Sequence, residues 1–157
     1  MTPDHKEELK VWIAAGLWMV VIAIESTDFL SAEHTNKILY PILHFLFNLD
    51  LVHFRVWHHY IRKTGHFVGY FILSALLFRA WKATLRLPSS WAMRWAAIAF
   101  FMTALVAGLD EWHQTFLPSR TGAFRDVVLD STGALTAQLL IFLYWRKRSG
   151  RLQAAGD

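Results

Sequence analysis

The stretch GLDEWHQTFLPSRTGAFRDVVLDSTGALTAQ, residues 108–138, decides how this chain folds. Long apolar segments flank it, yet it is rich in ionisable side chains. Ionisable groups at membrane depth cost several kcal/mol each unless they are paired or hydrated. The stretch is therefore either an ordinary polar loop between two helices or a functional site, and we favour a site because its charges continue into both flanking segments. Among its polar residues are Asp110, Glu111, His113, Gln114, Arg120, Arg125, Asp126 and Asp130.

The composition indicates an integral membrane protein of about one domain's length. The 157 residues are 55% hydrophobic and only 18% charged, and the apolar residues come in blocks. The absence of cysteine excludes disulfides, thiolate metal ligands and a cysteine nucleophile. Because the basic residues behind the net charge of +4 cluster beside apolar blocks, we interpret them as topology signals and expect no nucleic-acid partner.

The apolar blocks predict an all-α, polytopic membrane helical bundle. Residues 36–60 are apolar but interrupted by Pro41, Asn48, Asp50 and Arg55, which favours one or two amphipathic helices in the outer interface. We expect a polar head over residues 1–8, a membrane domain over 9–148 and a polar tail over 149–157. The four predicted transmembrane helices are residues 9–24, 63–81, 91–109 and 126–145.

Small residues predict where these helices approach closely. Gly65 and Gly69 are four residues apart in the second predicted span, a spacing typical of close helix packing. Gly133, Ala134 and Ala137 form a comparable small-residue face on the fourth span. Residues 87–90 are predicted to break the chain before the third span, with Ser90 as its cap.

The basic connections predict how the chain crosses the cytoplasmic membrane. Cytoplasmic connections carry an excess of Lys and Arg. Both termini are therefore expected in the cytoplasm, with residues 25–63 and 110–126 outside. The outer segments do carry some basic residues, but they also hold most of the acids. The most basic positions are Arg79, Lys82, Arg86 and Arg94, and then Arg146, Lys147, Arg148 and Arg151.

Helical spacing places polar residues of the second and fourth spans on defined faces. Lys63, His66 and Tyr70 lie at i, i+3 and i+7, so they share one face. Asp126 and Asp130 are four residues apart and also share a face. Asp126 has the alternative role of capping its helix, and Lys63 that of reaching out to lipid headgroups.

The third span contributes two adjacent carboxylates, Asp110 and Glu111, each within one helical turn of Gln114. Arg120 lies in the loop that follows. Three helices and this loop are therefore expected to bring a polar stripe to the outer third of the bundle.

Such a set fits two kinds of chemistry. Arg and Lys can recognise an anionic headgroup, whereas neighbouring carboxylates with a histidine can move a proton or bind a divalent cation, the one candidate cofactor. The identity of a metal stays open, and His44, His53, His58 and His59 lack ligand spacing. The candidate catalytic residues are His66, Asp110, Glu111, Asp126 and Asp130. The candidate substrate-binding residues are Lys63, Tyr70, Gln114 and Arg120.

These residues resemble the VanZ-like family of small membrane proteins. The family pattern contains Lys-x-x-His-Phe-x-x-Tyr, then Asp-Glu-x-x-Gln-x-Phe-x-Pro-x-Arg, then an Asp and an Asn/Asp-x-x-Gly segment. The chain departs from it at Asp130, where the family commonly has Asn, and at Ser119, where Gly is frequent. The matching residues are Lys63, His66, Phe67 and Tyr70; Asp110, Glu111, Gln114, Phe116, Pro118 and Arg120; and Asp126, Asp130 and Gly133.

The resemblance implies a membrane location and a link to low-level resistance to the glycopeptide teicoplanin, but no reaction. We therefore consider a protein that acts on or binds an anionic envelope lipid, such as a phospholipid or a polyprenyl-linked peptidoglycan precursor. A non-enzymatic protein that alters the envelope or a partner's assembly is the main alternative, and an ion-coupled transporter is a third. Membrane lipids are the expected partners, and the sequence leaves the oligomeric state open.

Overall fold

The computed structural model of this chain describes residues 3–27, 32–85, 93–118 and 120–154. Within these residues it contains helices and no strand, so the all-α prediction is confirmed. The predicted breaker at residues 87–90, with Ser90 as a cap, and Ser119 lie outside the described residues. The helices are α1 (Pro3–Ser26), α2 (Ala32–Phe47), α3 (Leu51–Thr84), α4 (Met93–Gln114) and α5 (Phe124–Ala154).

Three of the described helices are long and apolar enough to cross a membrane: His5–Ser26, Met93–Gln114 and Phe124–Ser149. They agree with the predicted helical membrane bundle. The second of the four predicted spans, residues 63–81 of α3, is not among them. Polar side chains that α3 brings into the bundle, including Lys63 and His66, lower the hydropathy of this segment.

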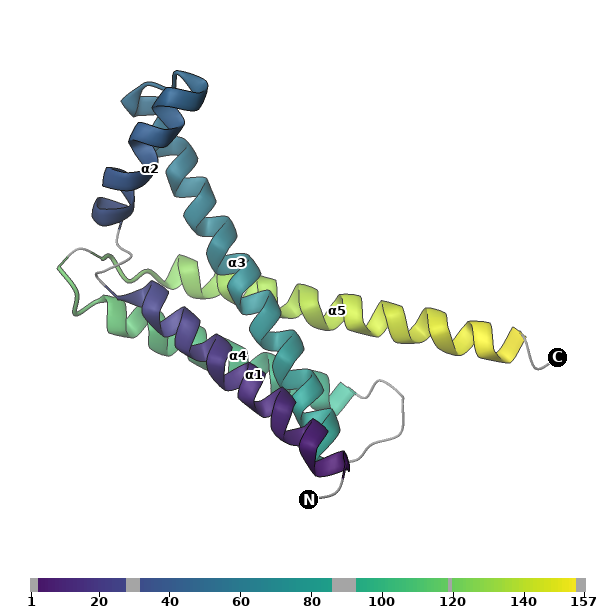
Figure 1. The fold of residues 1–157 in the computed structure, drawn as a ribbon. Helices are drawn as coiled ribbons and strands as arrows, with labels where there is room; N and C mark the ends of the chain where they lie inside the picture. Colours follow the sequence, from purple (N-terminus) through teal and green to yellow (C-terminus); the bar gives the residue numbers. More distant parts are fainter. Residues whose placement is uncertain (1–2, 28–31, 86–92, 119, 155–157) are drawn as a thin grey trace.

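Helix α3 is the centre of the bundle and packs against α1, α4 and α5 (Figure 1). Trp12, near the start of α1, donates through Nε1 to Oγ1 of Thr84 at the end of α3, at 2.8 Å. Farther along, Trp18 of α1 donates through Nε1 to the carbonyl of Gly69 in the middle of α3, also at 2.8 Å. The earlier residue of α1 contacts the end of α3, and the later residue of α1 contacts the middle of α3. The two helices therefore run antiparallel.

Helix α5 runs parallel to α3. Lys63 pairs with Asp126 near the start of α5, and one turn on His66 faces Asp130. Deeper in the bundle, Nε2 of Gln138 donates to Oγ of Ser74 at 2.8 Å, with both residues buried. Because a polar contact recurs down this interface, the two helices are held at a fixed rotation.

Helices α5 and α3 approach each other closely at Gly133. A Cβ added there would lie 2.4 Å from the carbonyl oxygen of Phe67, nearer than real Cβ atoms come to another atom. Ala134 and Ala137 beside it are completely buried. The predicted small-residue face of α5 is therefore confirmed as a packing surface.

The predicted close contact through Gly65 and Gly69 is wrong within this chain. Beyond the glycine's own helix backbone, a Cβ on either one would meet none of the described residues within 4 Å. Gly65 is exposed, and Gly69 takes part in packing through its carbonyl. Their spacing fits a close helix contact, but no helix of the bundle crosses α3 tightly on that face.

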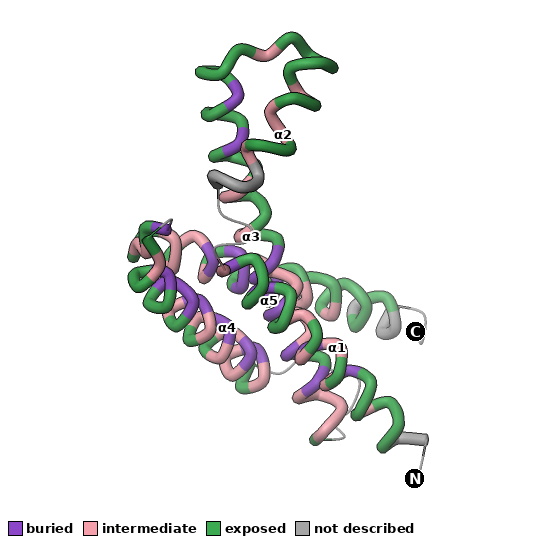
Figure 2. The backbone as a smooth tube through the Cα atoms, turned by 60° about the vertical axis from the view of Figure 1, so that its left-hand side comes forward, coloured by how far each residue is buried: buried purple, intermediate pink, exposed green. Residues whose placement is uncertain are grey.

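Helix α2 and residues 51–62 of α3 form an arm that projects from the bundle (Figure 1) and is largely exposed (Figure 2). Asn48 has a φ of 50°, which ends α2, and Asp50 caps α3 by accepting the backbone N–H of His53 at 2.9 Å. This backbone hydrogen bond lowers the pKa of Asp50 below its ordinary value. Tyr40 of α2 packs edge-on against Phe54, with ring centroids 5.1 Å apart.

The arm corrects the prediction for residues 36–60. One amphipathic helix is present there, as α2, but residues 51–60 are the first turns of α3 and not a separate interfacial helix. No Pro or Gly follows Asp50 before Gly65, so nothing ends the helix at the predicted boundary near residue 62. Charge alone does not break a helix.

The other helices are also longer than predicted. Helix α1 begins at Pro3 and α5 extends to Ala154, so much of the predicted polar head and tail is helical. Helix α4 continues to Gln114, and the acidic pair therefore lies inside its last turns.

Candidate functional site

The residues selected from the sequence gather at one end of the bundle, where α1 and α4 end and α5 begins. Asp110 and Glu111 come from the last turns of α4, and Asp126 and Asp130 from the first two turns of α5. The stripe on α3 faces them from the centre of the bundle. The predicted polar stripe is therefore formed by side chains of α3, α4 and α5, the helices that contain the second, third and fourth predicted spans.

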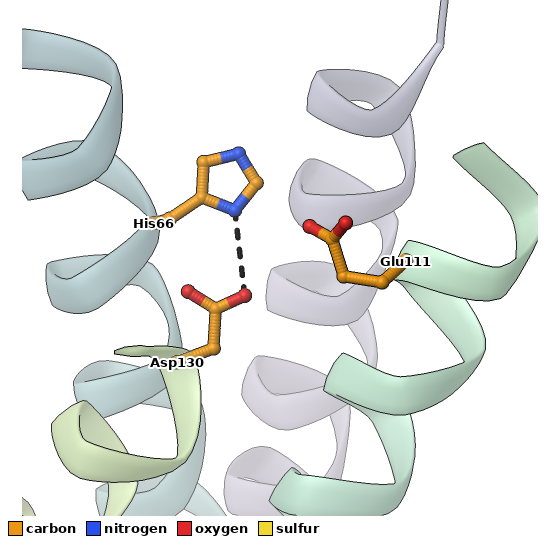
Figure 3. A group of neighbouring side chains, drawn as sticks. All are labelled: His66, Glu111 and Asp130. Atoms are coloured by element: carbon orange, nitrogen blue, oxygen red, sulfur yellow. Dashed lines mark ion pairs between the residues drawn. The ribbon is translucent and has the colours of Figure 1, made fainter. Parts of the chain in front are cut away.

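The side chains of His66, Glu111 and Asp130 form a cluster within the site (Figure 3). One potential ligand atom from each residue lies within 4.8 Å of the others. Nδ1 of His66 is 3.5 Å from Oδ2 of Asp130, whose side chain is completely buried. Figure 3 shows the Glu111 carboxylate directed toward the other two side chains. This donor set could share a proton or hold a divalent cation.

Hydrogen bonds orient the two carboxylates of α4. Oε2 of Glu111 accepts the backbone N–H of Ala123 at 2.8 Å. Oδ2 of Asp110 accepts the Tyr70 hydroxyl at 2.9 Å and Nε2 of Gln114 at 3.2 Å. Tyr70, which was predicted to bind substrate, is buried, and its hydroxyl orients Asp110.

Lys63 forms an ion pair with Asp126, and both side chains are partly exposed. The pair joins α3 to the first turn of α5. It gives Asp126 a charged partner beyond the capping role that a helix start would provide.

Arg120 joins the connection between α4 and α5 to the end of α1. Its Nη2 donates to the backbone carbonyls of Glu25 and Thr27, the second at 2.9 Å, and the residue is buried. The last carbonyls of a helix lack helical partners and carry partial negative charge, so a guanidinium is favourable there. Arg120 was predicted to bind a headgroup; its hydrogen bonds to α1 add a role in holding the site together.

The same connection folds tightly against α4. A Cβ on Gly122 would lie 2.2 Å from the carbonyl oxygen of Glu111, so a larger residue would push the connection away. This close approach carries the neighbouring Ala123 N–H to the Glu111 carboxylate.

A pocket of about 360 Å³ lies between the arm and this end of the bundle. It is rich in cationic and histidine side chains. Among the described lining residues, Asp126 is the one carboxylate, and Lys63 pairs with it. Of the residues selected from the sequence, the lining includes Lys63, His66, Gln114, Arg120 and Asp126; it also includes Asn36, Arg55, His58, His59, Arg62 and Thr121.

Sequence reasoning missed the contribution of the arm to this pocket. Arg55, His59, Arg62 and His66 are spaced by four, three and four residues, so they continue the polar stripe of α3 toward its N-terminus. The spacing was visible in the sequence. Because the helix is predicted to begin at residue 63, the predicted stripe starts only at Lys63.

Fold and site together define a multi-pass helical membrane protein with a buried histidine–carboxylate cluster at one end of its bundle. The model of the VanZ/LLP1 family matches residues 11–145, most of the chain. The chain belongs to the VanZ/LLP1 family, which confirms the resemblance seen in the sequence. No curated protein and no solved structure matches it.

Proposed function

We propose that this protein crosses the cytoplasmic membrane four times, with both termini inside and the site facing outward. The polar site lies at one end of the bundle and the described basic positions of α3, α4 and α5 lie toward the other end. This arrangement is in keeping with the excess of Lys and Arg in cytoplasmic connections. At the basic end, Lys82 of α3 lies 3.9 Å from the ring centroid of Trp145 on α5. Helix α3 would be the fourth span, its polar side chains turned into the bundle and away from lipid.

We further propose that the outward pocket binds the anionic headgroup of an envelope lipid. The observation that carries this proposal is the excess of cations in the pocket lining. Among the described lining residues, Arg55, Arg62, Lys63 and Arg120 outnumber the one carboxylate, Asp126. Guanidinium groups form paired hydrogen bonds with phosphate oxygens, and lysine adds a compact charge. A phosphate is therefore the chemical group that best fits the lining.

The arm supports a lipid as the source of that phosphate. Phe45 is 88% exposed and Phe47 is 67% exposed at the end of α2. An amphipathic helix with exposed aromatic side chains is suited to the membrane interface, where headgroups lie. A lipid whose acyl chains stay in the membrane could thus present its headgroup beneath the arm.

The test compares two substitutions that remove the same charge. Arg62→Gln removes a half-buried cation from the pocket, and Arg146→Gln removes an exposed one at the opposite end. Hydrogen bonds to charged groups contribute about 1.5–3 kcal/mol, so Arg62→Gln should weaken phosphate binding about 10- to 100-fold. Arg146→Gln should leave binding unchanged.

The assay measures binding of phosphatidylglycerol, a polyprenyl phosphate, inorganic phosphate and zwitterionic phosphatidylcholine to the purified protein in detergent, by native mass spectrometry. Preference for one of the two anionic lipids identifies the source, and binding of inorganic phosphate alone means that the pocket takes a free anion. Equal binding by both variants contradicts the proposal. Analysis of the same mixtures for lipid products distinguishes an enzyme from a binder.

The family resemblance adds a cellular readout to the proposal. If the pocket modifies or sequesters an envelope lipid, cells that produce the native chain should tolerate more teicoplanin than cells that produce Arg62→Gln. If the two kinds of cell contain equal amounts of the protein and tolerate teicoplanin equally, the pocket does not contribute to teicoplanin tolerance.

A further inference from the structure

The cluster of His66, Glu111 and Asp130 leaves polar atoms unsatisfied in a buried place. Among the described residues, no hydrogen-bond partner is found for Nδ1 of His66, Oε1 of Glu111 or either carboxylate oxygen of Asp130. Buried polar groups are almost always paired, and a buried charge without a partner is costly. Three such side chains directed at one another indicate a shared occupant.

The distances fit a metal ion better than a hydrogen bond. Charge-assisted N–H···O bonds are about 2.7–2.9 Å long. Nδ1 of His66 and Oδ2 of Asp130 are 3.5 Å apart. Two ligands on a tetrahedral ion at about 2.1 Å are about 3.4 Å apart, which matches this separation. Glu111, within 4.8 Å of both, would complete the set by a small rotation of its flexible side chain.

The Glu111 carboxylate is oriented by a hydrogen bond, as carboxylate ligands in metal sites commonly are. Its Oε2 accepts the backbone N–H of Ala123, and its buried Oε1 has no hydrogen-bond partner among the described residues. Hydrogen bonds of this kind orient ligating carboxylates and contribute to metal affinity.

We propose that His66, Glu111 and Asp130 bind one divalent transition-metal ion, Mn²⁺ or Zn²⁺. One imidazole with two carboxylates, and no thiolate, suits these ions. Three protein ligands leave a coordination position for water or for a phosphate oxygen from the adjoining pocket, which His66 also lines. The ion would also offset the negative charge of the buried carboxylates. This metal site stands apart from headgroup binding, because its three ligands need no lipid.

The experiment measures metal binding without any lipid. Protein purified in detergent is stripped with a chelator and titrated with Mn²⁺ alone, followed by electron paramagnetic resonance, and then with Zn²⁺ in competition. We expect one ion per chain. The spectrum of Mn²⁺ bound to the native protein should show coupling to one imidazole nitrogen. That coupling should disappear in His66→Gln. The midpoint temperature of thermal unfolding should rise when the stripped protein is reloaded with metal, because the ion binds the folded state.

A matched pair of variants locates the ion. Asp130→Asn replaces an anionic ligand with a weaker, neutral one at little change of shape and should weaken Mn²⁺ binding about 100-fold or more, since even the loss of an outer hydrogen bond costs 10- to 100-fold. Asp126→Asn, on the same helix but paired with Lys63, should keep the native affinity and the imidazole coupling. The proposal is overturned if the stripped native protein takes up neither ion, or if Asp130→Asn retains full affinity. Loss of the ion in both variants would also overturn it, by moving the site away from these three residues.

Discussion

Substitution of Gly133 by alanine tests the close approach of α5 to α3. The new Cβ would lie 2.4 Å from the carbonyl oxygen of Phe67 and 3.2 Å from its carbonyl carbon. Both atoms belong to the backbone, so no side chain can rotate away. The helices must separate by roughly 0.6–1 Å to restore an ordinary contact, and overpacking of this kind costs about 1–3 kcal/mol.

Gly108→Ala is the matched control. Gly108 lies in the apolar part of α4, and a Cβ there would meet no atom within 4 Å from the part of the chain that the structure describes, its own helix backbone aside. Alanine is favoured over glycine in a helix by about 0.8–1 kcal/mol, and both variants gain this contribution. The difference between them therefore isolates the contact with Phe67.

The assay is thermal unfolding in detergent, followed by tryptophan fluorescence. A change of 1 kcal/mol moves the midpoint of a chain this long by about 2–4 °C, so Gly133→Ala should unfold about 2–12 °C below Gly108→Ala. Gly133 lies one turn from Asp130, so the same variant should also bind Mn²⁺ more weakly. If Gly133→Ala is as stable as Gly108→Ala, the helices do not touch at this point and the position assigned to Asp130 is wrong.

Three further outcomes are expected. Tyr70→Phe should lower stability by about 1–3 kcal/mol in the same unfolding assay, because it removes a hydrogen bond from the buried Asp110; an unchanged midpoint would contradict that bond. Arg120→Lys should lower the midpoint despite keeping the charge, because an ammonium cannot reproduce the planar guanidinium that holds the end of α1; native stability and lipid binding in this variant would reduce Arg120 to a point charge. In this cysteine-free chain, Thr121→Cys should react with an impermeant thiol reagent applied outside cells and Ser149→Cys should not, and the reverse pattern would invert the proposed topology.

The sequence by itself determined which residues share a face of one helix. The spacing of Lys63, His66 and Tyr70 put them on one side of α3, and that side meets the carboxylates of α4 and α5 in the structure. The small-residue face at Gly133 could be predicted in the same way. Helical periodicity is a local property, so it can be read without knowledge of any partner.

The sequence did not determine where α3 begins. A charged, histidine-rich segment over residues 51–62 resembled an interfacial piece, although nothing in it ends a helix. The segment is instead the first part of α3, and it packs against α2 through Tyr40 and Phe54. As a continuation of α3 it brings Arg55 and Arg62 to the pocket.

Only the tertiary structure decided which partner each polar side chain has. From spacing alone, Asp130 could have met Lys63, His66 or Arg120; the structure pairs it with His66, gives Lys63 to Asp126 and directs Arg120 to the end of α1. These choices depend on the depth and rotation at which helices cross. Those are set by close contacts such as Gly133 against Phe67, between residues far apart in the chain, and no periodicity within a single helix records them.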